Sequence, residues 1–236
     1  NIRQINIESL EEIPLINNIA KTLNLKTKIG IRINPNINAK THDKISTGRS
    51  SDKFGISIND LLNVINKIHE SKNILFVGIS CHIGSQIFSL DIYEKTFLKI
   101  KEVIKLFHDN NLSIHHLNLG GGMGFDPASN RIFDLDKFSK IINQYFKNET
   151  YELSIEPGRY LTAKSGTLIT KILMVKSSSN NNFIIVDAGM NTFIRPALYN
   201  AVHNILPNIK NKEDTNYIVV GPICESSDIF VKNIKL

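Results

Sequence analysis

Short runs rich in β-branched residues alternate with longer stretches in which apolar residues recur at helical spacing. The first pair is an expected strand at 4–7 and a helix near 8–23. Further strands are expected at 28–33, 75–82, 115–119 and 152–156, and further helices at 59–71, 90–110 and 136–146. Strands that alternate with helices favour right-handed βαβ units, so the sequence predicts an α/β fold with a parallel sheet.

Four of the five strands are followed by polar or glycine-rich residues. These are Asn34-Pro35, His82-Ile83-Gly84-Ser85, Gly120-Gly121-Gly122 and Glu156-Pro157-Gly158-Arg159. In a parallel barrel, functional groups gather at the carboxyl ends of the strands. Turn chemistry alone would explain the glycines and prolines, but it does not explain the other side chains. We therefore predict a partial (β/α)8 TIM-type barrel with a site at this edge, and three further strands upstream.

The pattern changes after residue 163, where strands follow one another with little helix between them. Strands are expected at 167–175, 182–186 and 217–220, with a short turn near 195–204 and a hairpin loop at 177–182. We predict a (β/α) barrel domain at 1–165 and a mostly β carboxyl-terminal domain at 166–236.

Composition excludes several classes of protein. Hydrophobic residues make up 42% of the chain, and no apolar run approaches the roughly 18 residues that a membrane span requires. The net charge of +6 comes from lysines spread along the chain rather than from a basic block, so neither a membrane nor a nucleic-acid partner is expected. Cys81 and Cys224 lie too far apart to form a metal-binding pair; we expect a reducing cytoplasm and no metal.

Two of the clusters have more than one chemical interpretation. Gly120, Gly121 and Gly122 follow a strand and could form a tight turn or let backbone N–H groups approach a phosphate. The Gly-Lys-Ser/Thr of a nucleotide P-loop is absent. His82 could offer a flat imidazole to a ligand next to the Ser85 hydroxyl, or be a structural histidine.

The remaining polar pairs are similarly ambiguous when taken singly. Glu156 could hold a proton on a pyridine nitrogen and Arg159 could bind a carboxylate or phosphate, or the two could form an ion pair at the barrel rim. Cys224 beside Glu225 could be an acid–base group with a substrate anchor, or an ordinary apolar thiol.

The motifs become specific when they are read in order. The series resembles the barrel-type pyridoxal-phosphate (PLP) decarboxylases, above all the diaminopimelate decarboxylases, over essentially the whole chain. The residues that carry this resemblance are Arg32-Ile33-Asn34-Pro35, Lys53-Phe54-Gly55, Cys81-His82-Ile83-Gly84-Ser85-Gln86, Gly120-Gly121-Gly122, Glu156-Pro157-Gly158-Arg159, Asp187-Ala188-Gly189-Met190-Asn191, Arg195-Pro196-Ala197-Leu198-Tyr199 and Gly221-Pro222-Ile223-Cys224-Glu225.

The resemblance implies a cofactor site for pyridoxal 5'-phosphate. It implies that His82 stacks on the cofactor ring, that Glu156 faces the pyridine nitrogen, and that Ser85 lies near the phosphate. The other cofactor-binding residues that it implies are Gly120, Gly121, Gly122, Gly158 and Arg159.

The resemblance also implies a substrate site and a partner. It assigns Arg159, Arg195 and Tyr199 to an amino-acid substrate, Cys224 to proton donation and Glu225 to substrate anchoring. In that family the Cys-Glu pair comes from the second subunit, so a homodimer with a shared active site is expected. The implied reaction is decarboxylation of meso-2,6-diaminopimelate to L-lysine and carbon dioxide, the last step of lysine biosynthesis.

Two departures qualify this expectation. The family's cofactor-binding lysine lies in an Ala-x-Lys-Ala-Asn context that no lysine here has, and a tyrosine downstream of the Cys-Glu motif is also absent. We therefore expect the chain to be a fragment, and the activity to be that of the complete protein. The alternatives are a sister decarboxylase acting on ornithine, arginine or carboxynorspermidine, a non-catalytic PLP-binding relative, and a racemase. An aspartate after the cysteine would favour an ornithine enzyme, and an arginine in place of Glu156 a racemase.

Overall fold

A computed structural model describes residues 2–39, 47–48, 52–126, 131–208 and 215–235. The chain divides into two compact units, one of residues 1–125 and 132–163 and the other of residues 126–131 and 164–236. The predicted domain boundary between residues 165 and 166 stays a prediction.

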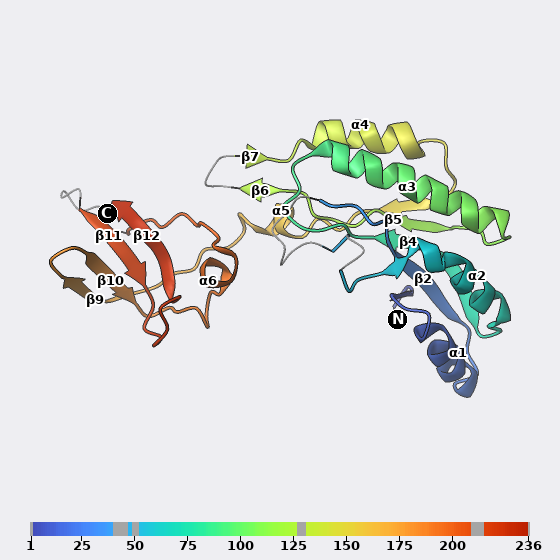
Figure 1. Ribbon diagram of the computed structural model, residues 1–236, viewed down its shortest axis with the longest axis horizontal. Helices are drawn as coiled ribbons and strands as arrows, with labels where there is room; N and C mark the ends of the chain where they lie inside the picture. The colour runs from blue at the N-terminus through green and yellow to red at the C-terminus, as the bar shows by residue number, and fades with distance from the viewer. Residues whose placement is uncertain (1, 40–46, 49–51, 127–130, 209–214, 236) are drawn as a thin grey trace. The chain divides into compact units, whose positions relative to one another are not determined.

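The first unit is a parallel sheet with helices along one side of it (Figure 1). Strands follow the order β1-β2-β4-β5-β8, with β3 paired to the end of β2, and every pair is parallel. The strands are β1 (Ile5–Ile7), β2 (Thr27–Asn34), β3 (Ile56–Ser57), β4 (Ile74–Cys81), β5 (His116–Asn118) and β8 (Glu152–Ser154). The helices are α1 (Glu12–Thr22), α2 (Leu61–Glu70), α3 (Leu90–Asp109), α4 (Leu135–Phe146) and the short α5 (Arg159–Thr162). The parallel sheet is thereby confirmed.

The two faces of the sheet differ in polarity because side chains alternate along each strand. Ile29, Ile31 and Ile33 of β2 are buried in one apolar cluster with residues of the helices. On β5, Leu117 belongs to the same cluster, whereas the flanking His116 and Asn118 are polar. Polar residues such as His116 and Asn118 therefore lie on the side of the sheet that faces away from the helices.

Helix α3 carries its buried residues at intervals of three and four, which fixes its orientation against the sheet and α4. The ring centroids of Tyr93 and Phe138 lie 4.9 Å apart, and those of Phe97 and Phe146 lie 5.3 Å apart. Edge-on aromatic pairs of this kind add to the stabilisation that burial provides. Within the described ranges, no helix combines the length and the apolar character that crossing a membrane demands.

Several boundaries differ from the predicted ones. The helix expected from residue 8 begins at Glu12, and the Glu12 carboxylate accepts the backbone N–H groups of Glu8 (2.6 Å) and Ser9 (3.1 Å), which fixes the residues before the helix. The strand expected at 152–156 ends at Ser154. The 3-10 turn Ile58–Asp60, helix α5, strand β3 and the small hairpin of β6 (Phe125–Asp126) and β7 (Arg131–Ile132) were not predicted. The segment between β2 and β3, residues 35–55, lies partly outside the described residues.

The second unit is a four-stranded sheet in the order β12-β11-β10-β9. Its strands are β9 (Ile172–Ser177), β10 (Asn182–Val186), β11 (Asn216–Val220) and β12 (Ile229–Lys235), and a short helix α6 spans Arg195–Tyr199. Strand β12 was not predicted. The strand expected from 167 begins at Ile172, since the backbone N–H of Lys171 donates to the Asp187 side chain (2.9 Å) instead of to a neighbouring strand. The mostly β character is confirmed.

Candidate functional site

The Asn118 side chain joins the ends of β5 and β8. Its Oδ1 accepts the backbone N–H of Gly120 (2.8 Å), and its Nδ2 donates to Glu156 Oε1 (2.7 Å). The backbone N–H of Glu156 in turn donates to the Gly120 carbonyl oxygen (2.7 Å). One carboxamide thereby fixes the predicted glycine turn and the predicted carboxylate relative to each other.

The glycine turn needs glycine because backbone groups approach it closely. A Cβ on Gly120 would overlap the Cys81 carbonyl oxygen, and one on Gly121 would overlap the Glu156 carbonyl oxygen. Gly120 has a φ of +70° and Gly122 a φ of +93°, conformations that other residues rarely adopt. The turn therefore brings the carboxyl ends of β4, β5 and β8 together.

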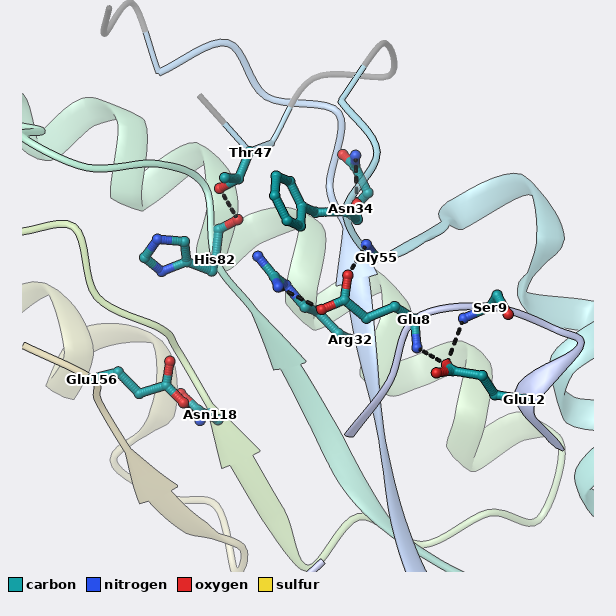
Figure 2. A network of polar contacts seen from close by, with 11 residues as sticks. Glu8, Ser9, Glu12, Arg32, Asn34, Thr47, Gly55, His82, Asn118 and Glu156 are labelled. Atoms are coloured by element: carbon teal, nitrogen blue, oxygen red, sulfur yellow. Dashed lines mark hydrogen bonds and ion pairs between the residues drawn. The ribbon is translucent and has the colours of Figure 1, made fainter. Parts of the chain in front are cut away.

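His82 directly follows β4 and bonds to this turn. Its Nδ1 accepts the backbone N–H of Gly121 (3.2 Å), which requires this nitrogen to be unprotonated. Burial, and next the positive charge of Arg32, lower the pKa of the imidazole below its ordinary value, while Glu156 acts in the opposite direction. His82 is thus held as a neutral ring near the Glu156 carboxylate (Figure 2).

An ion pair between Arg32 and Glu8 holds the Arg32 guanidinium in place near His82. Arg32 Nη1 lies 2.6 Å from Glu8 Oε1, and Glu8 Oε2 accepts the backbone N–H of Gly55 (3.0 Å). The Arg32 guanidinium also lies 5.1 Å from the centre of the Phe54 ring. In Figure 2 the Arg32 side chain reaches from β2 toward His82, with Glu8 on its other side.

The other predicted residues of the first unit lie in turns near this edge. Ser85 belongs to a turn that is joined to the glycine turn by a hydrogen bond from the Ile87 N–H to the Gly122 carbonyl oxygen (2.8 Å). Gly158 precedes α5, and Arg159 is the first residue of that helix. The Arg159 Nε is buried and has no hydrogen-bond partner among the described residues.

Four predicted residues lie in the second unit. Arg195 and Tyr199 face each other on α6, with the guanidinium carbon 5.4 Å from the ring centre, and Arg195 Nε is buried without a hydrogen-bond partner in the described part of the chain. Cys224 is exposed, and Glu225 Oε1 accepts the Ser226 hydroxyl (3.3 Å). Both arginines therefore have a buried Nε–H donor without an acceptor among the described residues.

The chain matches one known protein family over the part that holds the candidate residues of the first unit. The family described as "Pyridoxal-dependent decarboxylase, pyridoxal binding domain" matches residues 1–163, which include the glycine turn, His82 and Glu156. The chain belongs to this family.

Similar members of the pyridoxal-dependent decarboxylases are longer proteins. The diaminopimelate decarboxylase of Bacteroides thetaiotaomicron is 39% identical over 98% of this chain, which spans 61% of that protein. The structure of the Helicobacter pylori diaminopimelate decarboxylase in complex with L-lysine has a TM-score of 0.94 and 37% sequence identity to this chain. The match covers all of this chain and 59% of the Helicobacter pylori chain. The structure of the M. jannaschii diaminopimelate decarboxylase, also in complex with L-lysine, has a TM-score of 0.88 and 34% sequence identity. That match covers all of this chain and 56% of the M. jannaschii chain. These similarities confirm the predicted barrel-plus-β fold and PLP as the cofactor of the family.

Three residues that fix candidate residues within their own unit were assigned no role from the sequence. Asn118 precedes the glycine turn by two residues and could have been found from the period of two along β5. Glu8 binds Arg32 over a separation of 24 residues. Asp228 binds Met190 over a separation of 38 residues. No local pattern signals these last two contacts.

The environment of His82 predicts its titration. In the cofactor-free complete protein, the pKa of His82 should lie below the 6.5 of an unperturbed imidazole, as measured by NMR titration with His82→Gln for assignment. Because the unfolded chain binds the proton more readily, the neutral ring contributes stability above about pH 6.5 that is lost as the pH falls.

Arg32→Gln should raise the pKa of His82 toward its ordinary value but not restore it fully, because burial is the larger cause. Lys53→Gln is the matched control, since Lys53 also lies over the Phe54 ring, 5.3 Å from its centre, and should leave this pKa unchanged. A pKa at or above 6.5 in the unsubstituted protein would contradict this account.

Proposed function

We propose that the complete protein catalyses the PLP-dependent decarboxylation of meso-2,6-diaminopimelate to L-lysine and carbon dioxide. The observation that carries this proposal is the cluster of His82, the glycine turn and Glu156 at one edge of the parallel sheet. The same chain has the Cys224-Glu225 pair and is 39% identical to a diaminopimelate decarboxylase.

The residues at this edge fit a pyridine-type cofactor. Glu156 Oε1 is bonded to Asn118, and Oε2 accepts no hydrogen bond among the described residues, so it is available to a protonated ring nitrogen. The neutral imidazole of His82 offers a flat, uncharged ring. The glycine turn carries no side chains, because neighbouring carbonyl groups occupy the places where they would lie, so only its backbone faces a bound group. We assign phosphate binding to Gly120, Gly121, Gly122 and Ser85, with Gly158 and Arg159 beside the cofactor.

The proposed chemistry needs little from each protein group. PLP, when bound, accepts the electron pair that remains when an amino acid loses carbon dioxide. Glu156 holds a proton at the ring nitrogen, and Asn118 keeps the carboxylate oriented for this task. His82 limits the movement of the ring, and its hydrogen bond to the Gly121 N–H fixes the imidazole.

The substrate has two amino-acid ends, of which the D end is proposed to react. Arg159, Arg195 and Tyr199 bind its carboxylates, because a guanidinium suits a carboxylate through paired hydrogen bonds. Glu225 pairs with the distal ammonium, and the Cys224 thiol delivers a proton to the carbon that has lost carbon dioxide. This division of roles lets the site distinguish meso-diaminopimelate from amino acids that lack a distal carboxylate.

We further propose a homodimer in which Cys224 and Glu225 complete the active site of the partner subunit. The exposure of Cys224 supports this arrangement, since its thiol is accessible to another chain. The cytoplasm is the proposed location, and both cysteines being free thiols supports it.

Replacing Glu156 tests the cofactor assignment. Glu156→Gln in the complete protein should retain PLP but lower kcat by on the order of a hundredfold, because the amide cannot stabilise the protonated nitrogen. Glu152→Gln, at an exposed carboxylate of β8 that is paired with Arg3, is the control and should leave kcat within about twofold, because surface ion pairs contribute little. Absorbance of the bound cofactor and carbon dioxide release are measured together. Near-normal kcat in Glu156→Gln would make Glu156 a structural residue.

Mixed dimers test the shared site. Cys224→Ala and Glu156→Gln subunits, each nearly inactive alone, should form one native site per mixed dimer. An equimolar mixture should therefore recover about a quarter of the native activity, since half of the dimers are mixed and each has one of two sites intact. Subunit exchange is verified by mass spectrometry. No recovery after verified exchange would place both residues in one subunit's site and rule out sharing.

A further inference from the structure

Asp228 is the one buried carboxylate within the described ranges, with 3% of its surface exposed. It lies at the end of residues 221–228, the Cys-Glu loop, which carries Cys224 and Glu225 between β11 and β12. A buried carboxylate is unfavourable unless its oxygens accept hydrogen bonds. Its partners therefore indicate what the residue holds in place.

Each carboxylate oxygen of Asp228 accepts a backbone N–H from a different loop. Oδ1 accepts from Met190 (2.6 Å), in the segment that follows β10, and Oδ2 accepts from Ile223 (2.8 Å), in the Cys-Glu loop itself. Met190 belongs to the segment that leads into α6, where Arg195 and Tyr199 lie. One side chain thus ties the two substrate-binding segments of this unit together.

The backbone of Asp228 closes the same loop. Its carbonyl oxygen accepts the N–H of Gly221 (3.0 Å), and its N–H donates to the Glu225 carbonyl oxygen (3.0 Å). The Glu225 N–H donates to the Ile223 carbonyl oxygen (2.8 Å). Cys224 therefore lies between Ile223 and Glu225, which each form a hydrogen bond with Asp228 and one with each other.

Two glycines leave the space that the carboxylate occupies. A Cβ on Gly221 would overlap Asp228 Oδ2, and one on Gly189 would lie 2.8 Å from Ile223 Cγ1 and 3.3 Å from Asp228 Oδ2. Both segments are thus shaped around this side chain. The Gly-Pro-Ile-Cys-Glu motif begins with glycine because a larger residue would displace the carboxylate.

We propose that Asp228 is the positioning residue that sets the place of Cys224 and Glu225 relative to the segment carrying Arg195 and Tyr199. This inference rests on the proposed function, because it assigns Asp228 an effect on turnover that acts through Cys224 and Glu225. Asp228 itself contacts backbone groups of the two loops and takes no chemical part in the reaction.

The test is a set of double-mutant cycles in the complete, PLP-loaded enzyme. Asp228→Asn places an amide NH2 opposite one of the two N–H groups, so one hydrogen bond is lost. It should lower kcat by on the order of a hundredfold, because small displacements of a reacting group have effects of that size. In a Cys224→Ala background the same substitution should change kcat less than about threefold. In the otherwise unsubstituted enzyme Asp228→Asn should also raise KM, and in a Glu225→Ala background this increase in KM should be absent.

Glu152→Gln is the control, because this exposed carboxylate of the first unit pairs with Arg3, and its replacement should leave kcat within about threefold. Gly221→Ala is the second variant, because it retains the carboxylate and displaces it; it should reproduce the kcat loss if Asp228→Asn does not fold. Multiplicative effects of Asp228→Asn and Cys224→Ala on kcat would overturn the proposal.

Hydrogen exchange separates failure of this proposal from failure of the proposed function. Amides of residues 187–193 and 221–228 should exchange at least about tenfold faster in Asp228→Asn than in Glu152→Gln, whatever the chemistry of Cys224. If Cys224→Ala retains full kcat, the proposed role of Cys224 is wrong, and exchange then decides whether Asp228 orders the loop. Unchanged exchange in both segments would refute the positioning role.

Discussion

The backbone ends of β4, β5 and β8 lie so close together that side chains at Gly120 and Gly121 would overlap the carbonyl oxygens of Cys81 and Glu156. This close approach brings three strand ends to one small area. Parallel pairing makes it possible, because all the carboxyl ends meet at the same edge. Asn118 then connects the turn to Glu156, and Gly121 binds His82. The site depends on backbone proximity first and on side-chain chemistry second.

Both units use one buried polar side chain to fix loops that local sequence would leave free. In the first unit the neutral amide of Asn118 both donates and accepts, so it can join a backbone N–H to a carboxylate. In the second unit two N–H groups must be held, and the Asp228 carboxylate has two accepting oxygens for them. In each unit the type of side chain matches the donors and acceptors that it connects.

The sequence predicted the parallel sheet and the position of most strands because helical and strand periods alternate along the chain. It also predicted the cluster of His82, the glycine turn and Glu156, since strand ends in a parallel sheet share an edge. It did not predict that α1 begins at Glu12, that β12 exists, or that Glu8 and Asp228 bind distant backbone groups. The contacts of Glu8 and Asp228 and the pairing of β12 form only after distant segments have met, and no local propensity encodes them, whereas the start of α1 involves contacts only three and four residues apart.

The substrate assignment is tested most directly by the selectivity of the complete protein with PLP. Carbon dioxide release and the amino-acid product are measured with meso-diaminopimelate, L-ornithine and L-arginine at matched concentrations. The account predicts that meso-diaminopimelate yields carbon dioxide and L-lysine in equal amounts, with a kcat/KM on the order of a hundredfold or more above the others, because only this substrate offers a distal carboxylate to Arg195 and Tyr199. A higher kcat/KM for ornithine or arginine, or no carbon dioxide from meso-diaminopimelate, would contradict it.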